Sequence, residues 1–110
     1  MNDIITHGRV IRDGRVAVLY SPGFGAGWST WAHDGEGKDL VFDPVIVGYV
    51  ERGAKAELAT YMEMRYPNVY TGGMDDLVIE WVPVGTLFKI NEYDGSESIE
   101  LKEADQWIVA

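Results

Sequence analysis

Cysteine is absent from this chain of 110 residues. Without it there can be no disulfide framework, no zinc-thiolate site and no thiol nucleophile. Long apolar runs are also missing, because no stretch approaches the roughly 18 uninterrupted apolar residues that a membrane-spanning helix needs. Residues 1–7 have neither the basic start nor the apolar run of a secretory signal. We therefore expect a cytoplasmic protein with no membrane segment.

Basic residues are scarce. The chain has 9 lysines and arginines against 18 aspartates and glutamates, so its formal net charge is −9 at pH 7. Phosphate contacts need cationic side chains, and this balance therefore disfavours direct binding to nucleic acid. An acidic surface attracts basic proteins or metal cations instead.

The acidic excess is concentrated near the C-terminus. Residues 91–110 contain six acidic side chains and one lysine, a net charge of −5, whereas residues 1–20 are slightly basic. Two interpretations stay open. The charge can keep the protein soluble and protect an edge strand from aggregation. It can also form a docking surface on which complementary charge speeds association with a partner.

The length and mixed composition of the chain predict a single α+β domain over residues 1–110. Asp13-Gly14 tolerates the positive φ angles of a type I′ turn, so we predict a β-hairpin from Ile4 to Tyr20. The second strand of this hairpin, over residues 16–20, is apolar on both faces. This pattern predicts a central strand that is covered on both sides.

Two helices are predicted to follow. Asp43 is a capping residue, Pro44 suits the first helical position, and Gly53 can end the helix. The β-branched run 45–47 would also suit a strand, but the capping signals favour a helix. A second helix over residues 55–66 carries one apolar stripe and stops at Pro67.

From residue 77 onward, apolar residues recur at every second position in the runs 77–82, 88–91 and 98–102. Turn signals at 83–85 and at Asp94-Gly95 separate these runs. We therefore predict an antiparallel meander of three strands, with a fourth short strand over 106–109. This meander completes the sheet on which the two helices pack.

The segment between the first hairpin and the helices is rich in glycines and aromatics. It contains Gly23, Gly25, Gly27, Trp28 and Trp31. Closely spaced glycines let backbone N–H groups approach an anion, but the spacing matches neither a dinucleotide nor a phosphate-loop motif. Two interpretations remain. The segment is a connection whose tryptophans pack in the core, or a shallow pocket in which a tryptophan stacks on a planar ligand and Ser29, Thr30 and loop amides hydrogen-bond to it.

Catalytic and metal chemistry find little support in the sequence. A His33–Ser29 pair would need an orienting acid such as Asp34 or Asp94, and no G-x-S-x-G motif is present. The acidic turns at 34–39 and 75–76 lack the loop length and terminal glutamate of an EF-hand. We therefore expect no cofactor and no metal, and we favour a non-enzymatic role.

Three strings of residues resemble a family of small proteins encoded mainly in bacteriophage and prophage genomes. They are GAGWSTW at 25–31, VYTGG at 69–73 followed by Asp76-Leu77, and GTLFKINEYDGSE at 85–97. Together they extend over the middle and C-terminal two-thirds of the chain. The resemblance lends no catalytic residues. It implies a context, because small acidic phage-type proteins often bind host proteins, including defence machinery, in the host cytoplasm.

Two functional hypotheses follow. The leading one is a non-enzymatic acidic protein that docks an aromatic-rimmed surface on a basic host protein, as an inhibitor or accessory with a possible anti-defence role. The alternative is a protein that binds or sequesters a nucleotide-like or other polar small molecule between the loop 23–31 and the turn 93–98. The candidate binding residues are Gly25, Gly27, Trp28, Ser29, Thr30, Trp31, Tyr93, Asp94, Ser96, Glu97 and Glu100.

Overall fold

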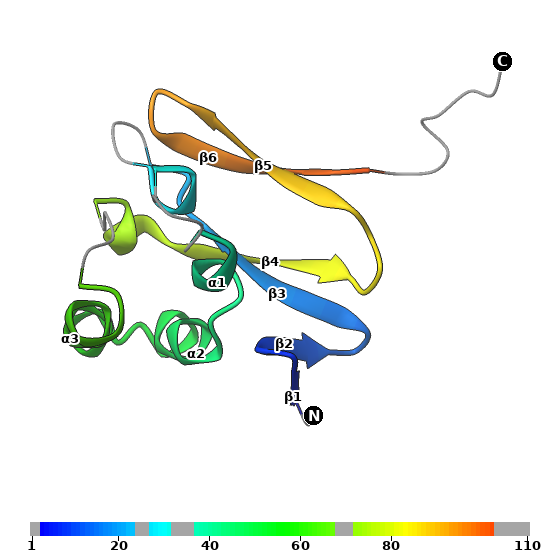
Figure 1. The fold of residues 1–110 in the computed structure, drawn as a ribbon, viewed down its shortest axis with the longest axis horizontal. Helices are drawn as coiled ribbons and strands as arrows, with labels where there is room; N and C mark the ends of the chain where they lie inside the picture. The colour runs from blue at the N-terminus through cyan, green and yellow to red at the C-terminus, as the bar shows by residue number, and fades with distance from the viewer. Residues whose placement is uncertain (1–2, 24–26, 32–36, 68–71, 103–110) are drawn as a thin grey trace, which may run out of the picture.

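The computed structural model describes residues 3–23, 27–31, 37–67 and 72–102 (Figure 1). Its strands are β1 (Ile4–Thr6), β2 (Arg9–Arg12), β3 (Arg15–Tyr20), β4 (Val78–Pro83), β5 (Phe88–Tyr93) and β6 (Ser96–Leu101). Its helices are α1 (Gly37–Leu40), α2 (Pro44–Arg52) and α3 (Lys55–Arg65), with 3₁₀ turns η1 (Ser29–Trp31) and η2 (Met74–Asp76). These elements confirm the predicted α+β class.

The N-terminal part of the sheet contains one more strand than a hairpin has. Asp13 and Gly14 adopt the expected positive φ angles of 53° and 75° between β2 and β3. His7 and Gly8 repeat this geometry, with φ angles of 52° and 72°, so β1 folds back on β2. Residues 4–20 therefore form three antiparallel strands joined by two tight turns.

The later strands do not form one continuous meander. β4 pairs with β3 along its whole length, from Arg15 opposite Pro83 to Tyr20 opposite Val78, which gives a four-stranded sheet in the order β1-β2-β3-β4. β5 and β6 form a separate two-stranded sheet. The turn after Pro83, where Gly85 has a φ of 86°, redirects the chain away from the edge of β4. The predicted strand over 106–109 lies outside the described residues.

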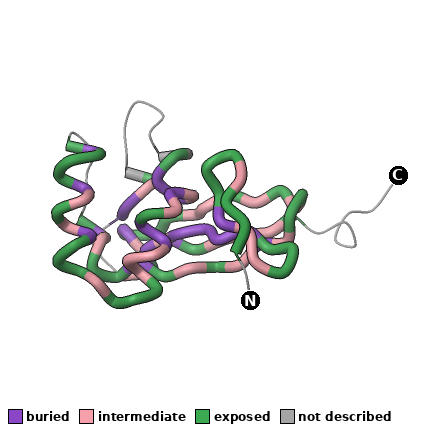
Figure 2. Tube along the Cα trace, turned by 90° about the horizontal axis from the view of Figure 1, so that it is seen from below, coloured by how far each residue is buried: buried purple, intermediate pink, exposed green. Residues whose placement is uncertain are grey.

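β3 is the middle of three layers. Ala17 and Leu19 on one face pack into a core with α2 and α3. Val16 and Val18 on the other face pack under the β5–β6 hairpin. Figure 1 shows the helices and this hairpin on opposite sides of β3, and Figure 2 shows the buried residues gathered along the middle of the molecule. The prediction of a central strand covered on both faces is confirmed.

The two predicted helices are confirmed, and both ends of α2 follow the capping signals. The Asp43 carboxylate accepts a hydrogen bond from the Val45 amide at 2.9 Å, and Gly53 ends α2 in the left-handed region with a φ of 67°. α3 ends at Arg65, just before Tyr66 and Pro67. Within the described part of the chain, no helix is long and apolar enough to cross a membrane.

Alanine substitutions at two glycines, Gly73 and Gly48, can test how tightly the chain packs around each of them. A Cβ added at Gly73 would lie 2.6 Å from the Ser21 Oγ and 2.7 Å from the Gly27 carbonyl oxygen, whereas one added at Gly48 in α2 would meet only the end of the Arg52 side chain at 3.3 Å. Gly73→Ala is expected to lower the free energy of unfolding by about 1–3 kcal/mol through overpacking. Gly48→Ala is expected to leave it unchanged or raise it by about 0.5–1 kcal/mol through helix propensity. Urea denaturation of both variants measures the difference, and equal effects would contradict the described packing around Gly73.

Candidate functional site

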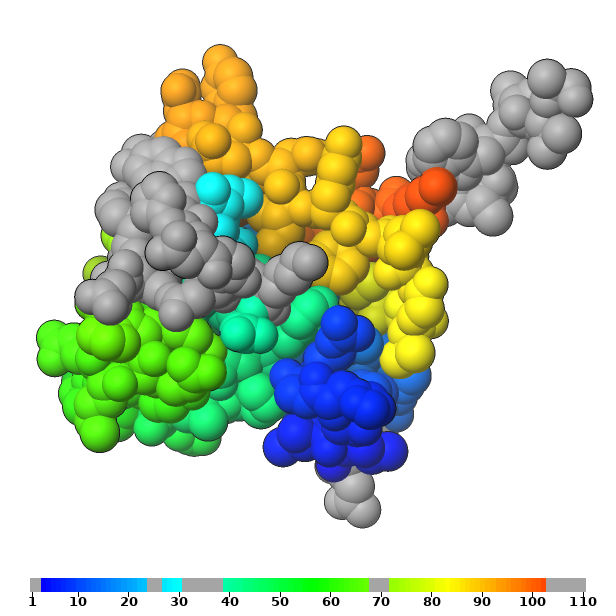
Figure 3. All heavy atoms as spheres, in the orientation of Figure 1, coloured from blue at the N-terminus to red at the C-terminus, as the bar shows by residue number. Residues whose placement is uncertain are grey.

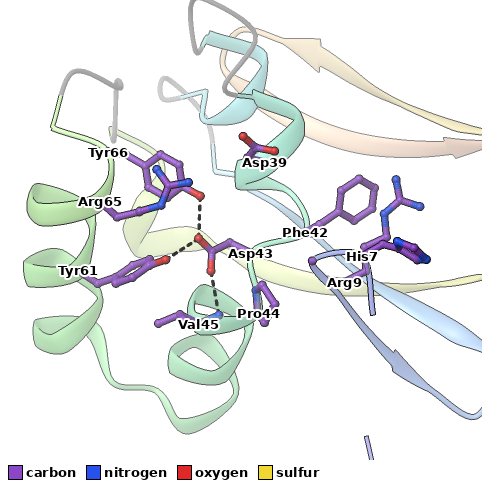
Figure 4. Close-up of a pocket in the computed structure, with 11 residues that line it drawn as sticks. His7, Arg9, Asp39, Phe42, Asp43, Pro44, Val45, Tyr61, Arg65 and Tyr66 are labelled. Carbon is purple, nitrogen blue, oxygen red and sulfur yellow. Dashed lines mark hydrogen bonds between the residues drawn. The ribbon is translucent and has the colours of Figure 1, made fainter. Parts of the chain in front are cut away.

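A hollow of about 480 Å³ opens between the β1–β2 turn, the α1–α2 connection and α3 (Figure 4). It is lined by His7, Gly8, Arg9, Asp39, Phe42, Asp43, Pro44, Val45, Tyr61, Arg65 and Tyr66. Most of these side chains are polar or aromatic, and they come from segments far apart in the sequence. Such a concave mixture of aromatic walls and a few converging polar groups is typical of small-molecule sites.

The Asp43 carboxylate organises one wall of this hollow. One of its oxygens, Oδ1, accepts hydrogen bonds from the backbone amides of Val45 and Ile46. The other, Oδ2, accepts hydrogen bonds from the hydroxyls of Tyr61 and Tyr66, each at 2.7 Å. The side chain is buried, with 7% of its residue surface exposed. Four neutral donors and the N-terminal dipole of α2 therefore hold this negative charge.

This environment raises the pKa values of Tyr61 and Tyr66. Burial, then the hydrogen bond to Asp43 and its charge, raise the pKa of Tyr61 to about 12. The same causes, in the same order, raise the pKa of Tyr66. Both hydroxyls are neutral near pH 7 and use their hydrogens on Asp43. Their oxygens can still accept a hydrogen bond from a ligand in the hollow.

Two arginines lie at opposite ends of the hollow in Figure 4. The Arg9 guanidinium stacks over the Phe42 ring at 4.2 Å from its centroid, and that of Arg65 stacks over the Tyr66 ring at 4.5 Å. Among the described residues, neither guanidinium has a carboxylate within ion-pair distance. Arg12, in contrast, is bonded to both Asp3 and Glu51. Arg9 and Arg65 thus keep donors for an anion.

A second buried carboxylate joins the glycine-rich segment to the last hairpin. Glu97 has 1% of its surface exposed. Its Oε1 accepts a hydrogen bond from the Ser21 amide, and its Oε2 accepts hydrogen bonds from the Trp28 amide, the Thr30 amide and the Thr30 hydroxyl. The backbone N–H groups of this segment do bind an anion, and that anion is the protein's own Glu97.

This geometry bears on two of the sequence interpretations. Glu97 was expected on a docking surface or at a pocket rim, but it is buried, which corrects that prediction. Trp28 was assigned either to the core or to a binding surface, and its 0% exposure confirms that it packs in the core. Among the described residues of the predicted pocket between 23–31 and 93–98, the Trp28 amide, the Thr30 amide and the Thr30 hydroxyl donate to Glu97. The two segments do lie together, because Ser96 Oγ also donates to the Pro22 carbonyl oxygen at 2.7 Å.

The remaining candidate residues are spread over several environments. Tyr93 is 75% exposed, Asp94 is exposed in the hairpin turn with a φ of 50°, and Glu100 is exposed and lies 3.8 Å from the Lys89 Nζ. Gly27 is buried and Ser29 is half-buried in η1. Gly25, the Trp31 side chain, His33 and Asp34 lie outside what the structure describes. Within the described residues, no group of three or more His, Asp or Glu side chains is arranged to hold a metal ion.

Sequence reasoning missed the hollow beside Asp43, and it misplaced Glu97. The alternation that puts Ile99 and Leu101 inward also puts Glu97 inward, because residues two apart on a strand share a face. The alternation of faces along β6 could therefore have predicted that Glu97 points inward. No comparable signal links Arg9, Phe42 and Arg65, which only the packing of the sheet and the helices brings together.

Comparisons with protein-family models, with curated proteins and with solved structures found no match for this chain. The resemblance to phage-encoded proteins therefore stays a prediction.

The Glu97 contacts predict a selective loss of stability. In Glu97→Gln, the amide N–H₂ replaces one carboxylate oxygen and faces backbone donors, so the free energy of unfolding should fall by about 2–3 kcal/mol. Glu100→Gln is the matched control on the exposed face of β6, and its effect should stay within about 0.5 kcal/mol. Urea denaturation monitored by tryptophan fluorescence compares the two. Equal effects would show that Glu97 is not the buried acceptor described here.

The tyrosine pair predicts a loss of stability at alkaline pH. The pKa of Tyr61 is raised from 10.0 to about 12, so the folded state favours the neutral hydroxyl. This contribution is complete below pH 10 and is lost as the pH rises through about 12. The free energy of unfolding should therefore fall over this range, and less steeply in Tyr61→Phe. Tyr93→Phe, which alters an exposed ring, should keep the wild-type slope; an unchanged slope in Tyr61→Phe would contradict the assignment.

Proposed function

We propose that this protein binds a small organic anion in the hollow between the β1–β2 turn and α3. One observation carries the proposal: Arg9 and Arg65 line the same hollow, and neither has a carboxylate partner among the described residues. The chain as a whole has twice as many acidic as basic side chains. Two arginines left without acidic partners in one cavity of such a protein are best explained by an anion that they bind.

The stacking geometry supports this role. A guanidinium that lies flat on an aromatic ring keeps its N–H groups at its edges, where they can reach a carboxylate or phosphate in a bidentate manner. The rings of Phe42 and Tyr66 restrict the two side chains before a ligand arrives, which lowers the entropic cost of binding. His7 lies next to Arg9 in Figure 4 and adds an imidazole that can donate a further hydrogen bond.

The acidic wall supports a defined orientation of the ligand. Asp43 is buried behind the hydroxyls of Tyr61 and Tyr66, and Asp39 is exposed at the rim. These two carboxylates repel an anionic group, which is attracted to the Arg9 guanidinium at the end of the hollow opposite Tyr66. A hydroxyl or amino group of the same ligand can instead donate to the tyrosine oxygens. The volume of about 480 Å³ suits a molecule of small-metabolite size.

Docking of an acidic surface on a basic host protein stays a prediction that no observation here tests. Of its aromatic and acidic residues, the described structure leaves Tyr93, Asp94 and Glu100 exposed. Glu100 already bonds to Asn91 and pairs with Lys89. Trp28 and Glu97 are buried and do not contribute to such a surface, and we favour the small-anion site.

The proposal predicts that binding depends on the two arginines. Butyrate, octanoate, benzoate and inorganic phosphate are the probes, and thermal shift followed by calorimetry is the measurement. A probe at 100 times its Kd should add about 2.7 kcal/mol to the free energy of unfolding. Arg9→Gln should weaken binding at least about tenfold, because a hydrogen bond to a charged group contributes about 1.5–3 kcal/mol. Arg65→Gln removes the second cation of the hollow, at its opposite end, and should weaken binding by a smaller factor.

Arg52→Gln is the matched control. Arg52 also ends a helix and stacks on an aromatic ring, with its guanidinium 5.0 Å from the Tyr49 centroid, but it does not line the hollow. Its substitution should leave affinity unchanged. The absence of binding by every probe, or equal losses in the three variants, would overturn the proposed function.

A further inference from the structure

A second hollow, of about 300 Å³, shares two lining residues with the first. Arg9 and Phe42 line both. The rest of its wall comes from β3, β4, the β4–β5 connection and the start of β5, and is mostly apolar, including Val16, Val82, Leu87 and Phe88. On the face shown in Figure 3, the N-terminal strands (blue) meet the β4–β5 region (yellow) beside the helical part (green). A polar and an apolar hollow thus meet at one pair of side chains.

The stacked Arg9–Phe42 pair forms the boundary between the two hollows. The guanidinium of Arg9 lies 4.2 Å from the centroid of the Phe42 ring. The Phe88 ring meets that of Phe42 edge-on, with centroids 6.0 Å apart and planes at 86°. A ligand head bound by Arg9 therefore lies next to a continuous aromatic and aliphatic wall, which begins at Phe42 and continues through Phe88.

Resting on the proposed function, we infer that the ligand is an amphipathic carboxylate. Its head binds the Arg9 guanidinium in the polar hollow, and its tail passes Phe42 into the apolar hollow. One guanidinium lies at the boundary, and its planar fork matches the two oxygens of a carboxylate. The tail covers Leu87, a residue with 65% of its surface exposed. Charge complementarity thus fixes the head, and apolar burial fixes the tail.

The unaltered protein gives the first test. Calorimetry with acetate, butyrate, hexanoate and octanoate, at concentrations where each is monomeric, should show affinity that rises with tail length. Full burial of a methylene raises affinity about fourfold, so an increase of about two- to fourfold per methylene is expected in an open groove. Octanol, which has the tail without the charged head, should bind at least about tenfold more weakly than octanoate.

A pair of variants locates the tail. Leu87→Ser removes an apolar side chain that lines the second hollow, and Val84→Ser removes one on the same connection that is 56% exposed but does not line it. Both positions are exposed, so both variants should fold, which circular dichroism checks. Leu87→Ser should weaken octanoate binding about tenfold and leave butyrate binding nearly unchanged, because the shorter tail does not reach Leu87. Val84→Ser should alter neither.

The outcomes separate the two proposals. If the carboxylates bind in an Arg9- and Arg65-dependent manner but affinity is independent of tail length, the small-anion function stands and the amphipathic ligand is overturned. The same holds if affinity rises with tail length but Leu87→Ser and Val84→Ser have equal effects, because the tail then lies elsewhere. If none of these carboxylates and no inorganic phosphate binds, both the inference and the proposed function fail.

Discussion

Asp43 stands between α1 and α2, and its carboxylate joins α2 to α3. One of its oxygens accepts hydrogen bonds from the first amides of α2, and the other accepts hydrogen bonds from the hydroxyls of Tyr61 and Tyr66. Tyr66 in turn carries the Arg65 guanidinium on its ring. One buried acid therefore starts a helix, fixes the position of the next, and positions a cation at the candidate site. Loss of this acid would leave the buried hydroxyl of Tyr66, the partly buried hydroxyl of Tyr61 and the first amides of α2 without their acceptor.

The two carboxylates that are buried in the described part of the chain, Asp43 and Glu97, both accept hydrogen bonds from neutral donors. Asp43 uses two amides and two hydroxyls, and Glu97 uses three amides and the Thr30 hydroxyl. Aligned dipoles can stabilise a buried charge without the second desolvation penalty that an ion pair incurs. This arrangement consumes no cations. Neither Asp43 nor Glu97 therefore needs Arg9 or Arg65 as a counter-ion.

Much of the local structure was accessible from the sequence, since it depends on neighbouring residues. Asp13-Gly14 and Asp94-Gly95 specify their turns through the φ angles that glycine and aspartate tolerate, and Asp43 with Gly53 bounds α2. The His7-Gly8 turn obeys the same rule but was not recognised, because His-Gly is a weaker signal than Asp-Gly. Glu97 was wrongly predicted to be exposed because it is charged, although the alternation along β6 places its side chain on the inward face.

By itself, the sequence determined the α+β class, the two longer helices with the caps of α2, the tight turns at Asp13-Gly14 and Asp94-Gly95, and a central strand apolar on both faces. Each of these follows from residues close together in the chain. Only the tertiary structure decided that β4 pairs with β3, that the glycine-rich segment binds Glu97, and that Arg9 and Arg65 line one hollow. These contacts join residues as much as about 70 positions apart. They form because apolar faces from distant parts of the chain pack together and exclude water. Which of these faces pack together is not visible in the local periodicity of the sequence.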